Sequence, residues 1–249
     1  MNDKPSAGLE AARLDHVAIA VADIASVVDT VAGTLGGVPD EGGPSWAFIG
    51  GQWRFAGGER LELLEPAGEP GGFLHRFLAG RGPGIHHVTF KIPDIARAAA
   101  ATQEAGFEVI GYRDTHPGWM EFFIHPKEAG GIVVQVAESH PELDEAWNPD
   151  WDFPQPSVPV LEAAELVGLR MAAADVDSTR RLWGDFLGGS ESEDEGLVVF
   201  RWQDSPLRMA FSVDASVDEG PLALELRGVE ARRLGAAHSE ALGTEFKLL

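Results

Sequence analysis

The sequence predicts an α+β fold built from tandem βαβββ modules, with the last module truncated. Residues 16–25 (HVAIAVADIA) and 87–96 (HVTFKIPDIA) align without gaps, and each reads as an apolar, β-branched strand that leads into a helix. Strand-like runs separated by glycine-rich turns follow both copies. A third copy begins at residue 167 and a fourth at residue 220, so one repeated unit accounts for most of the chain.

Each of the first two copies predicts one helix and three further strands. Asp23 and Asp94 can cap the helices, because a carboxylate accepts hydrogen bonds from the free N–H groups of a first helical turn. We expect these helices over residues 24–35 and 95–105, each ended by glycine. The strands are expected at residues 46–49, 53–56 and 60–66 in the first copy, and at 108–112, 119–124 and 131–136 in the second.

The second half of the chain predicts a degenerate pair of the same units. The third copy has an expected helix at 178–187 and strands at 196–202 and 207–213. The fourth has a strand from residue 220 and a helix at 230–242, and leaves no room for its last two strands. We therefore expect an N-terminal tail at 1–12, a metal-binding module at 13–137, a proline-rich acidic linker at 138–164, and a truncated module without metal ligands at 165–249.

The composition argues against several classes of protein. The chain has 40 acidic and 19 basic residues and a net charge of −21, so it lacks the basic surface of a nucleic-acid-binding protein. It has no cysteine, which excludes disulfides and zinc–thiolate sites. No apolar run approaches the ~18 residues of a membrane helix, and the N-terminus has no signal-like core. We expect a cytoplasmic protein without membrane or nucleic-acid partners.

Polar residues recur at matched places in the first two copies. His16 and His87 open the first strands, and Glu62 and Gln135 lie in the last strands. Two pseudo-symmetric copies packed together would bring these four side chains to one place. A single histidine on a strand is usually a hydrogen-bonded core residue, but two imidazoles with two matched oxygen donors predict a site for one divalent metal ion.

Four motifs of the first half resemble methylmalonyl-CoA epimerase, a member of the vicinal oxygen chelate superfamily with glyoxalase I, extradiol dioxygenases and bleomycin-resistance proteins. They are residues 14–21 (LDHVAIAV), 62–66 (ELLEP), 84–88 (GIHHV) and 124–127 (IHPK). The resemblance covers residues 13–137 and implies paired βαβββ units that enclose a metal. It assigns the four ligand positions to His16, Glu62, His87 and Gln135, and leaves His86 beside the site. Gly168 and Ala223 occupy the histidine positions in the second half.

The chain departs from the epimerases at both proton-transfer positions. Gln135 stands in place of the glutamate of the last strand, and Ala47 in place of the glutamate that follows the first helix. An amide cannot act as a base near pH 7. We therefore expect not a standard epimerase but a glyoxalase-like metal enzyme of the isomerase or lyase type, with Co, Ni, Zn, Mn or Fe. Its substrate would be a small 2-oxo acid, hemithioacetal or acyl thioester, and Glu62 its base. Metal-assisted hydrolysis or decarboxylation also fits.

The competing interpretation is a non-catalytic small-ligand binding or resistance protein of the bleomycin-resistance type. Such a protein would use an apolar groove, which Trp46, Trp53, Trp119 and Trp202 could line. The loss of both bases favours this class, whereas the retained histidines and Glu62 favour the enzyme. In either case the expected partner is a small molecule, and the chain is a monomer with paired modules or a homodimer.

Overall fold

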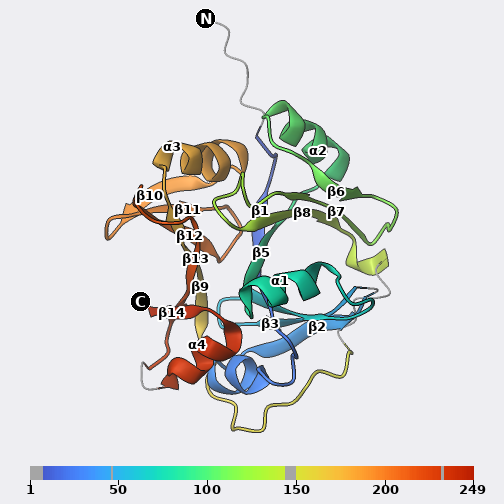
Figure 1. The fold of residues 1–249 in the computed structure, drawn as a ribbon, viewed down its shortest axis with the longest axis vertical. Coiled ribbons are helices and arrows are strands. Elements are labelled where there is room, and N and C mark those ends of the chain that lie inside the picture. The colour runs from blue at the N-terminus through green and yellow to red at the C-terminus, as the bar shows by residue number, and fades with distance from the viewer. Residues whose placement is uncertain (1–7, 46, 144–149, 231–232) are drawn as a thin grey trace, which may run out of the picture. The chain divides into compact units, whose positions relative to one another are not determined.

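The computed structural model describes residues 8–45, 47–143, 150–230 and 233–249 (Figure 1). Its strands form an eight-stranded sheet in the order β2-β3-β4-β1-β5-β8-β7-β6 and a six-stranded sheet in the order β10-β11-β12-β9-β13-β14. These sheets confirm the α+β fold of tandem βαβββ modules. The strands are β1 Arg13–Ala20, β2 Val38–Pro44, β3 Phe48–Arg54, β4 Arg60–Pro66, β5 Gly84–Lys91, β6 Ile110–Arg113, β7 Trp119–Ile124, β8 Val133–Ser139, β9 Glu165–Ala173, β10 Ser190–Asp194, β11 Leu197–Arg201, β12 Arg208–Val213, β13 Gly220–Arg227 and β14 Glu245–Leu248.

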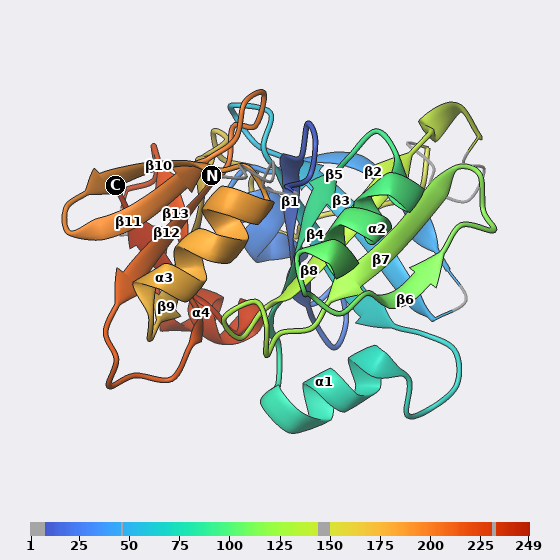
Figure 2. The ribbon, with the colours of Figure 1, turned by 90° about the horizontal axis from the view of Figure 1, so that it is seen from above.

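The helices are short. They are the α-helices α1 Phe73–Arg81, α2 Ile95–Glu104, α3 Val176–Thr179 and α4 Ala236–Leu242, the π-helices η1 Asp29–Thr34 and η3 Arg180–Phe186, and the 3₁₀-helix η2 Pro141–Leu143. The second predicted helix is confirmed as α2, and Asp94 caps it by accepting a hydrogen bond from the N–H of Arg97 at 2.9 Å. Figure 2 shows α2 beside β7 and β8, against which it packs.

The first predicted helix is wrong in type and in extent. Residues 25–27 form turns, and a π-helix follows over Asp29–Thr34. The N–H of Leu35 donates to the carbonyl of Thr30 at 2.9 Å. β-branched side chains restrict rotamers in a helix and so disfavour a regular α-helix. Four of them are crowded into this segment: Val27, Val28, Thr30 and Val31. The third predicted helix is likewise divided, into α3 and the π-helical η3.

A glycine pair expected to form a turn lies inside a strand instead. Gly50 and Gly51 belong to β3, where they pair with Leu64 and Leu63 of β4. The ring of Trp151 explains the missing side chains, since a Cβ on Gly51 would lie 2.7 Å from it. The glycines therefore make room for a residue from a distant part of the sequence. The prediction also missed β2 and β10.

The predicted absence of the fourth copy's last strand is wrong. β14 pairs in parallel with β13, just as β4 pairs in parallel with β1. The strands missing from this copy are therefore the two in the middle. In the shared register Lys247 occupies the position that Glu62 holds in the first copy. A lysine ammonium cannot ligate a metal.

The chain forms two compact units, each assembled from segments of both halves. One contains Met1–Asp15, Val88–Asp144 and Arg170–Pro221, and the other contains His16–His87, Glu145–Leu169 and Leu222–Leu249. In the first unit, the ring of Phe90 lies 4.9 Å from that of Trp202. In the second, Ala18 and Leu64 pack with Leu74 of α1. Among the described residues, no helix has the length and hydropathy of a membrane span.

Candidate metal centre

His16, Glu62 and His87 belong to the second compact unit and lie on three neighbouring strands. β1 lies between β4 and β5 in the sheet, and it carries His16 while they carry Glu62 and His87. Ala18 lies opposite Glu62 in the register and two residues after His16. Because alternate residues of a strand share a face, His16 and Glu62 lie on the same face. The small side chain of Ala18 leaves space between them.

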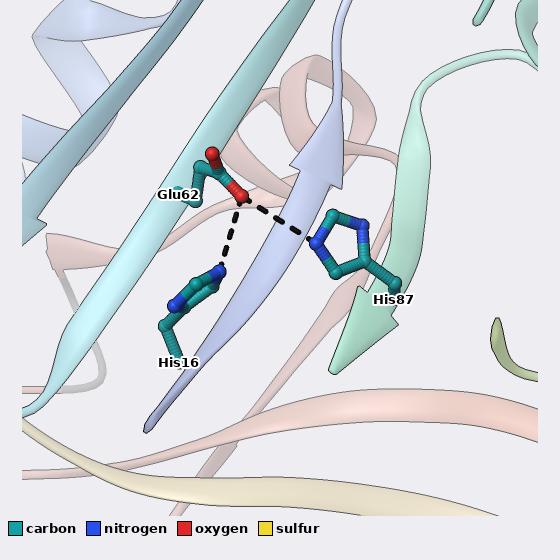
Figure 3. Close-up of side chains that lie close together, drawn as sticks. All are labelled: His16, Glu62 and His87. Carbon is teal, nitrogen blue, oxygen red and sulfur yellow. Dashed lines mark ion pairs between the residues drawn. The ribbon is translucent and has the colours of Figure 1, made fainter. Parts of the chain in front are cut away.

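The three side chains converge (Figure 3). The Oε2 atom of Glu62 lies 3.2 Å from the Nε2 atom of His16 and 3.5 Å from the Nε2 atom of His87. One potential ligand atom from each residue lies within 4.8 Å of the others. The residues are only 1%, 6% and 5% exposed in sequence order. Buried polar side chains gathered in this way are typical of a binding or catalytic site.

The ligand atoms suit a divalent transition metal. The Nε2 atom of His87 is buried and has no hydrogen-bond partner in the described part of the chain. An unpaired buried nitrogen is costly, and a metal ion would satisfy it. Two imidazoles and one carboxylate form a common ligand set for zinc, iron, cobalt, nickel and manganese. The residues present therefore fit the expected ion.

Charge and proton placement also favour ligation. Burial raises the pKa of Glu62, but the close polar contacts with His16 and His87 outweigh it and lower this pKa to about 2. The carboxylate is therefore ionised at neutral pH. Burial and the neighbouring His87 lower the pKa of His86 to about 3, so that ring is neutral.

His86 can fix the tautomer of His87. The Nδ1 atoms of the two rings lie 2.9 Å apart, so one must donate and the other must accept. If His87 donates from Nδ1, its Nε2 atom keeps the lone pair that a metal requires. Phe77 of α1 packs edge-on against the ring of His86 at 4.9 Å and holds it in place.

Gln135 belongs to the first compact unit, where both the nitrogen and the oxygen of its amide are hydrogen-bonded. Its nitrogen donates to Glu121 Oε2 at 2.7 Å, and its oxygen accepts from the hydroxyl of Thr89 at 2.5 Å. Its assignment as a fourth ligand stays a prediction. Ala47 precedes β3, and its N–H donates to the hydroxyl of Ser45. No carboxylate is present at that position.

The sequence missed Gln52, which lies on β3 directly opposite Glu62. Gln52 is 4% exposed, and its Oε1 atom has no hydrogen-bond partner among the described residues. Gln52 lies four residues after Phe48 in β3. In a continuous strand, residues an even number apart share a face, so this alternation could have revealed Gln52. The expected turn at Gly50 and Gly51 hid that alternation.

Two of the four tryptophans of the competing interpretation are not available to line an apolar groove. Trp53 and Trp202 are core residues, 0% and 4% exposed. Trp119 donates from its indole nitrogen to Glu121 at 2.8 Å. Trp46 lies outside the described residues.

The fold consists of tandem βαβββ modules, and a buried His–Glu–His cluster lies on one face of a sheet. Together these features define a class of protein with a candidate metal centre. A family model described as Glyoxalase/Bleomycin resistance protein/Dioxygenase superfamily matches residues 15–123. The chain is 34% identical over 138 residues to "Ethylmalonyl-CoA/methylmalonyl-CoA epimerase" of Cereibacter sphaeroides, a match that covers 51% of this chain and 97% of that protein. The human "Methylmalonyl-CoA epimerase, mitochondrial" is 30% identical over 139 residues, covering 51% and 74%.

One solved structure extends the likeness to both halves. A variant of 4-hydroxymandelate synthase from Streptomyces coelicolor covers 93% of this chain and 74% of its own, with a TM-score of 0.61 and 14% identity. At that identity the likeness shows the fold alone. Together with the epimerase relatives, the matches show that the chain belongs to the Glyoxalase/Bleomycin resistance protein/Dioxygenase superfamily.

Proposed function

We propose that this protein is a metal-dependent enzyme of the isomerase or lyase type. Its substrate would be a small 2-oxo acid, hemithioacetal or acyl thioester. The observation that carries the proposal is the convergence of His16, Glu62 and His87 in a buried cluster where the Nε2 atom of His87 makes no hydrogen bond within the described residues. The epimerase relatives, whose names refer to acyl-CoA thioesters, support a carbonyl substrate.

The side chains of the cluster would have two functions, which are metal binding and proton transfer. His16, His87 and the carboxylate of Glu62 would hold the ion, and a divalent ion bound there supplies a Lewis acid that polarises a carbonyl oxygen. Among the three clustered side chains, Glu62 is the one that can take a proton from carbon, if one of its oxygens leaves the ion. Burial excludes water from the three side chains and strengthens their electrostatic interactions.

The proposal excludes standard epimerase chemistry. A two-base epimerisation needs a proton donor and a proton acceptor on opposite faces of the substrate carbon. Gln135 and Ala47 stand where the resemblance expects the two carboxylates. We therefore propose a one-base reaction in the same superfamily.

Metal analysis of untagged protein tests the proposal. We expect about one equivalent of a divalent metal, lost in His16→Ala and in His87→Ala and retained in the matched control His116→Ala, whose histidine is exposed. The loaded protein would then be screened in D₂O with 2-oxo acids, hemithioacetals and acyl thioesters for deuterium incorporation. Protein that binds no metal, even on reconstitution, contradicts the proposal.

The second candidate is a non-catalytic binding protein of the bleomycin-resistance type, and the absence of carboxylates at Gln135 and Ala47 favours it. The burial of Trp53 and Trp202 in the core counts against the aromatic groove it would need. Metal-free protein stabilised against heat by small apolar compounds would support this candidate.

A further inference from the structure

Gln52 shares a face of the sheet with the metal cluster. In the antiparallel pairing of β3 with β4, Gln52 lies directly opposite Glu62. Residues paired in this way point to the same side, with Cβ atoms about 5 Å apart. The amide of Gln52 therefore lies next to the carboxylate that contacts His16 and His87.

The oxygen of this amide lacks a partner. The Oε1 atom of Gln52 is buried without a hydrogen bond among the described residues, whereas both amide atoms of Gln135 are paired. Native proteins satisfy almost all buried polar atoms, so a remaining unpaired acceptor indicates a missing donor. The Nε2 atom of His87 also makes no hydrogen bond among the described residues, and it lies 3.5 Å from Oε2 of the same carboxylate. Two atoms that lack hydrogen bonds beside one carboxylate indicate a single ligand-binding place.

The chemistry of Gln52 restricts that ligand. An amide oxygen accepts hydrogen bonds and cannot donate them. An ionised oxygen placed against Oε1 would be repelled, whereas a hydroxyl would donate to it. The site therefore discriminates between a protonated and an ionised oxygen.

We propose that Gln52 is a specificity residue of the metal centre, whose Oε1 atom accepts a hydrogen bond from a hydroxyl on the metal-bound ligand. The ligand class is a small oxygen chelator that carries a hydroxyl beside a carbonyl or carboxylate, such as a 2-hydroxy acid or the enol form of a 2-oxo acid. This inference rests on the proposed function, since it requires a metal at His16, Glu62 and His87.

Two chelators that differ at one oxygen test the inference. Glycolate offers a carboxylate and a hydroxyl, whereas oxalate offers two carboxylates. Their affinities would be measured on the metal-loaded protein by calorimetry, for the wild type and for Gln52→Leu and Gln52→Glu. We expect Gln52→Leu to weaken glycolate binding about tenfold, which corresponds to about 1.4 kcal/mol, and not to weaken oxalate binding.

The second variant and a control keep the test informative. Gln52→Glu retains an acceptor, so glycolate should still bind while oxalate binds more weakly. Gln103→Leu makes the same change at an exposed position of α2 and should alter neither affinity. Equal losses for both chelators, or no loss in Gln52→Leu, overturn the inference while the metal site stands. A wild-type protein that takes up no metal overturns the proposed function as well.

Discussion

Glu121 explains why an amide stands at position 135. This carboxylate is buried on β7 and accepts hydrogen bonds from Arg113, from the indole of Trp119 and from the amide nitrogen of Gln135. A glutamate at position 135 would place two carboxylates at hydrogen-bond distance, where both cannot remain ionised without strong repulsion. The glutamine that replaces the glutamate of the epimerase pattern therefore has a local hydrogen-bond partner in Glu121.

Exchanging the two groups tests this pairing. Gln135→Glu should destabilise the protein by roughly 2–4 kcal/mol at pH 7, because it replaces a charge-assisted hydrogen bond with repulsion. Adding Glu121→Gln should restore most of that stability, since the amide and carboxylate are then only interchanged. Urea unfolding of both single variants and the double variant gives the coupling energy. Additive effects would contradict the pairing.

The repeat made the three residues of the cluster predictable. The fourth polar residue beside them, Gln52, was not predicted, because its strand depends on a contact with a residue distant in the sequence. His16 and His87 occupy the same position in two copies, and Glu62 follows at the spacing of a strand that returns beside the first. Gln52 escaped because glycine pairs usually mark turns. The ring of Trp151 makes this pair part of a strand, and no local pattern contains that information.

At the scale of elements, two glycines of the second compact unit, one in a strand and one in a helix, give opposite expectations. A Cβ on Gly51 in β3 would lie 2.7 Å from the ring of Trp151, whereas a Cβ on Gly80 in α1 would meet nothing within 4 Å. Gly51→Ala should cost about 1–3 kcal/mol through overpacking. Gly80→Ala should stabilise the helix by about 0.5–1 kcal/mol. Chemical denaturation of both variants measures these effects, and a neutral Gly51→Ala would contradict the packing of Trp151 on β3.

The turn between β3 and β4 provides a pH-dependent element. Burial raises the pKa of Glu59, and the charge of Glu165 adds to this, although the carboxylate accepts a hydrogen bond from the N–H of Gly57 at 2.9 Å. A raised pKa means that the folded protein binds the proton more tightly than the unfolded chain does. The stabilisation is therefore complete below the unfolded pKa of 4.5 and is lost as pH rises through the folded pKa.

Glu59→Gln should remove this dependence. The difference in unfolding free energy, variant minus wild type, should increase as the pH rises from 4.5 to 7, because the amide carries no charge to bury. Urea unfolding of metal-free protein at several pH values gives the difference directly. Glu69→Gln, in the exposed segment before α1, is the control and should show no such trend. A constant difference for Glu59→Gln would show that burial does not destabilise its charge.

Strands were more predictable than helices for a physical reason. Alternation and β-branched residues identified β4, β7 and β12 closely. Whether a segment forms a regular α-helix depends on both the helix propensity of its residues and their burial. The segments that follow Asp94 and Asp23 show the two outcomes. Both side chains accept a hydrogen bond from the third residue that follows, but only Asp94 precedes an alanine-rich segment that continues as an α-helix.

At the scale of the whole molecule, each compact unit draws on both halves of the sequence. In the first unit Phe90 packs on Trp202, and the N–H of Leu9 donates to the carbonyl of Phe186 at 2.7 Å. In the second unit the N–H of Ala164 donates to the carbonyl of Leu35 at 2.9 Å. Separation of the halves would therefore open both hydrophobic cores, and neither half retains a complete unit.

Fragments divided in the segment between β8 and β9 test this interdependence. Residues 1–143 alone should lack a cooperative thermal transition as a monomer and should bind a hydrophobic dye, because Phe90 loses its cover from Trp202 and Leu35 loses its bond to Ala164. Co-expression with residues 144–249 should restore cooperative unfolding and yield a copurifying pair. Size-exclusion chromatography would detect a dimer in which two copies of the fragment bury each other's exposed apolar surface. Such a dimer would also show that residues 1–143 need a second segment to bury their core. A monomeric fragment with a sharp thermal transition would contradict it, because residues 1–143 would then contain a self-sufficient core.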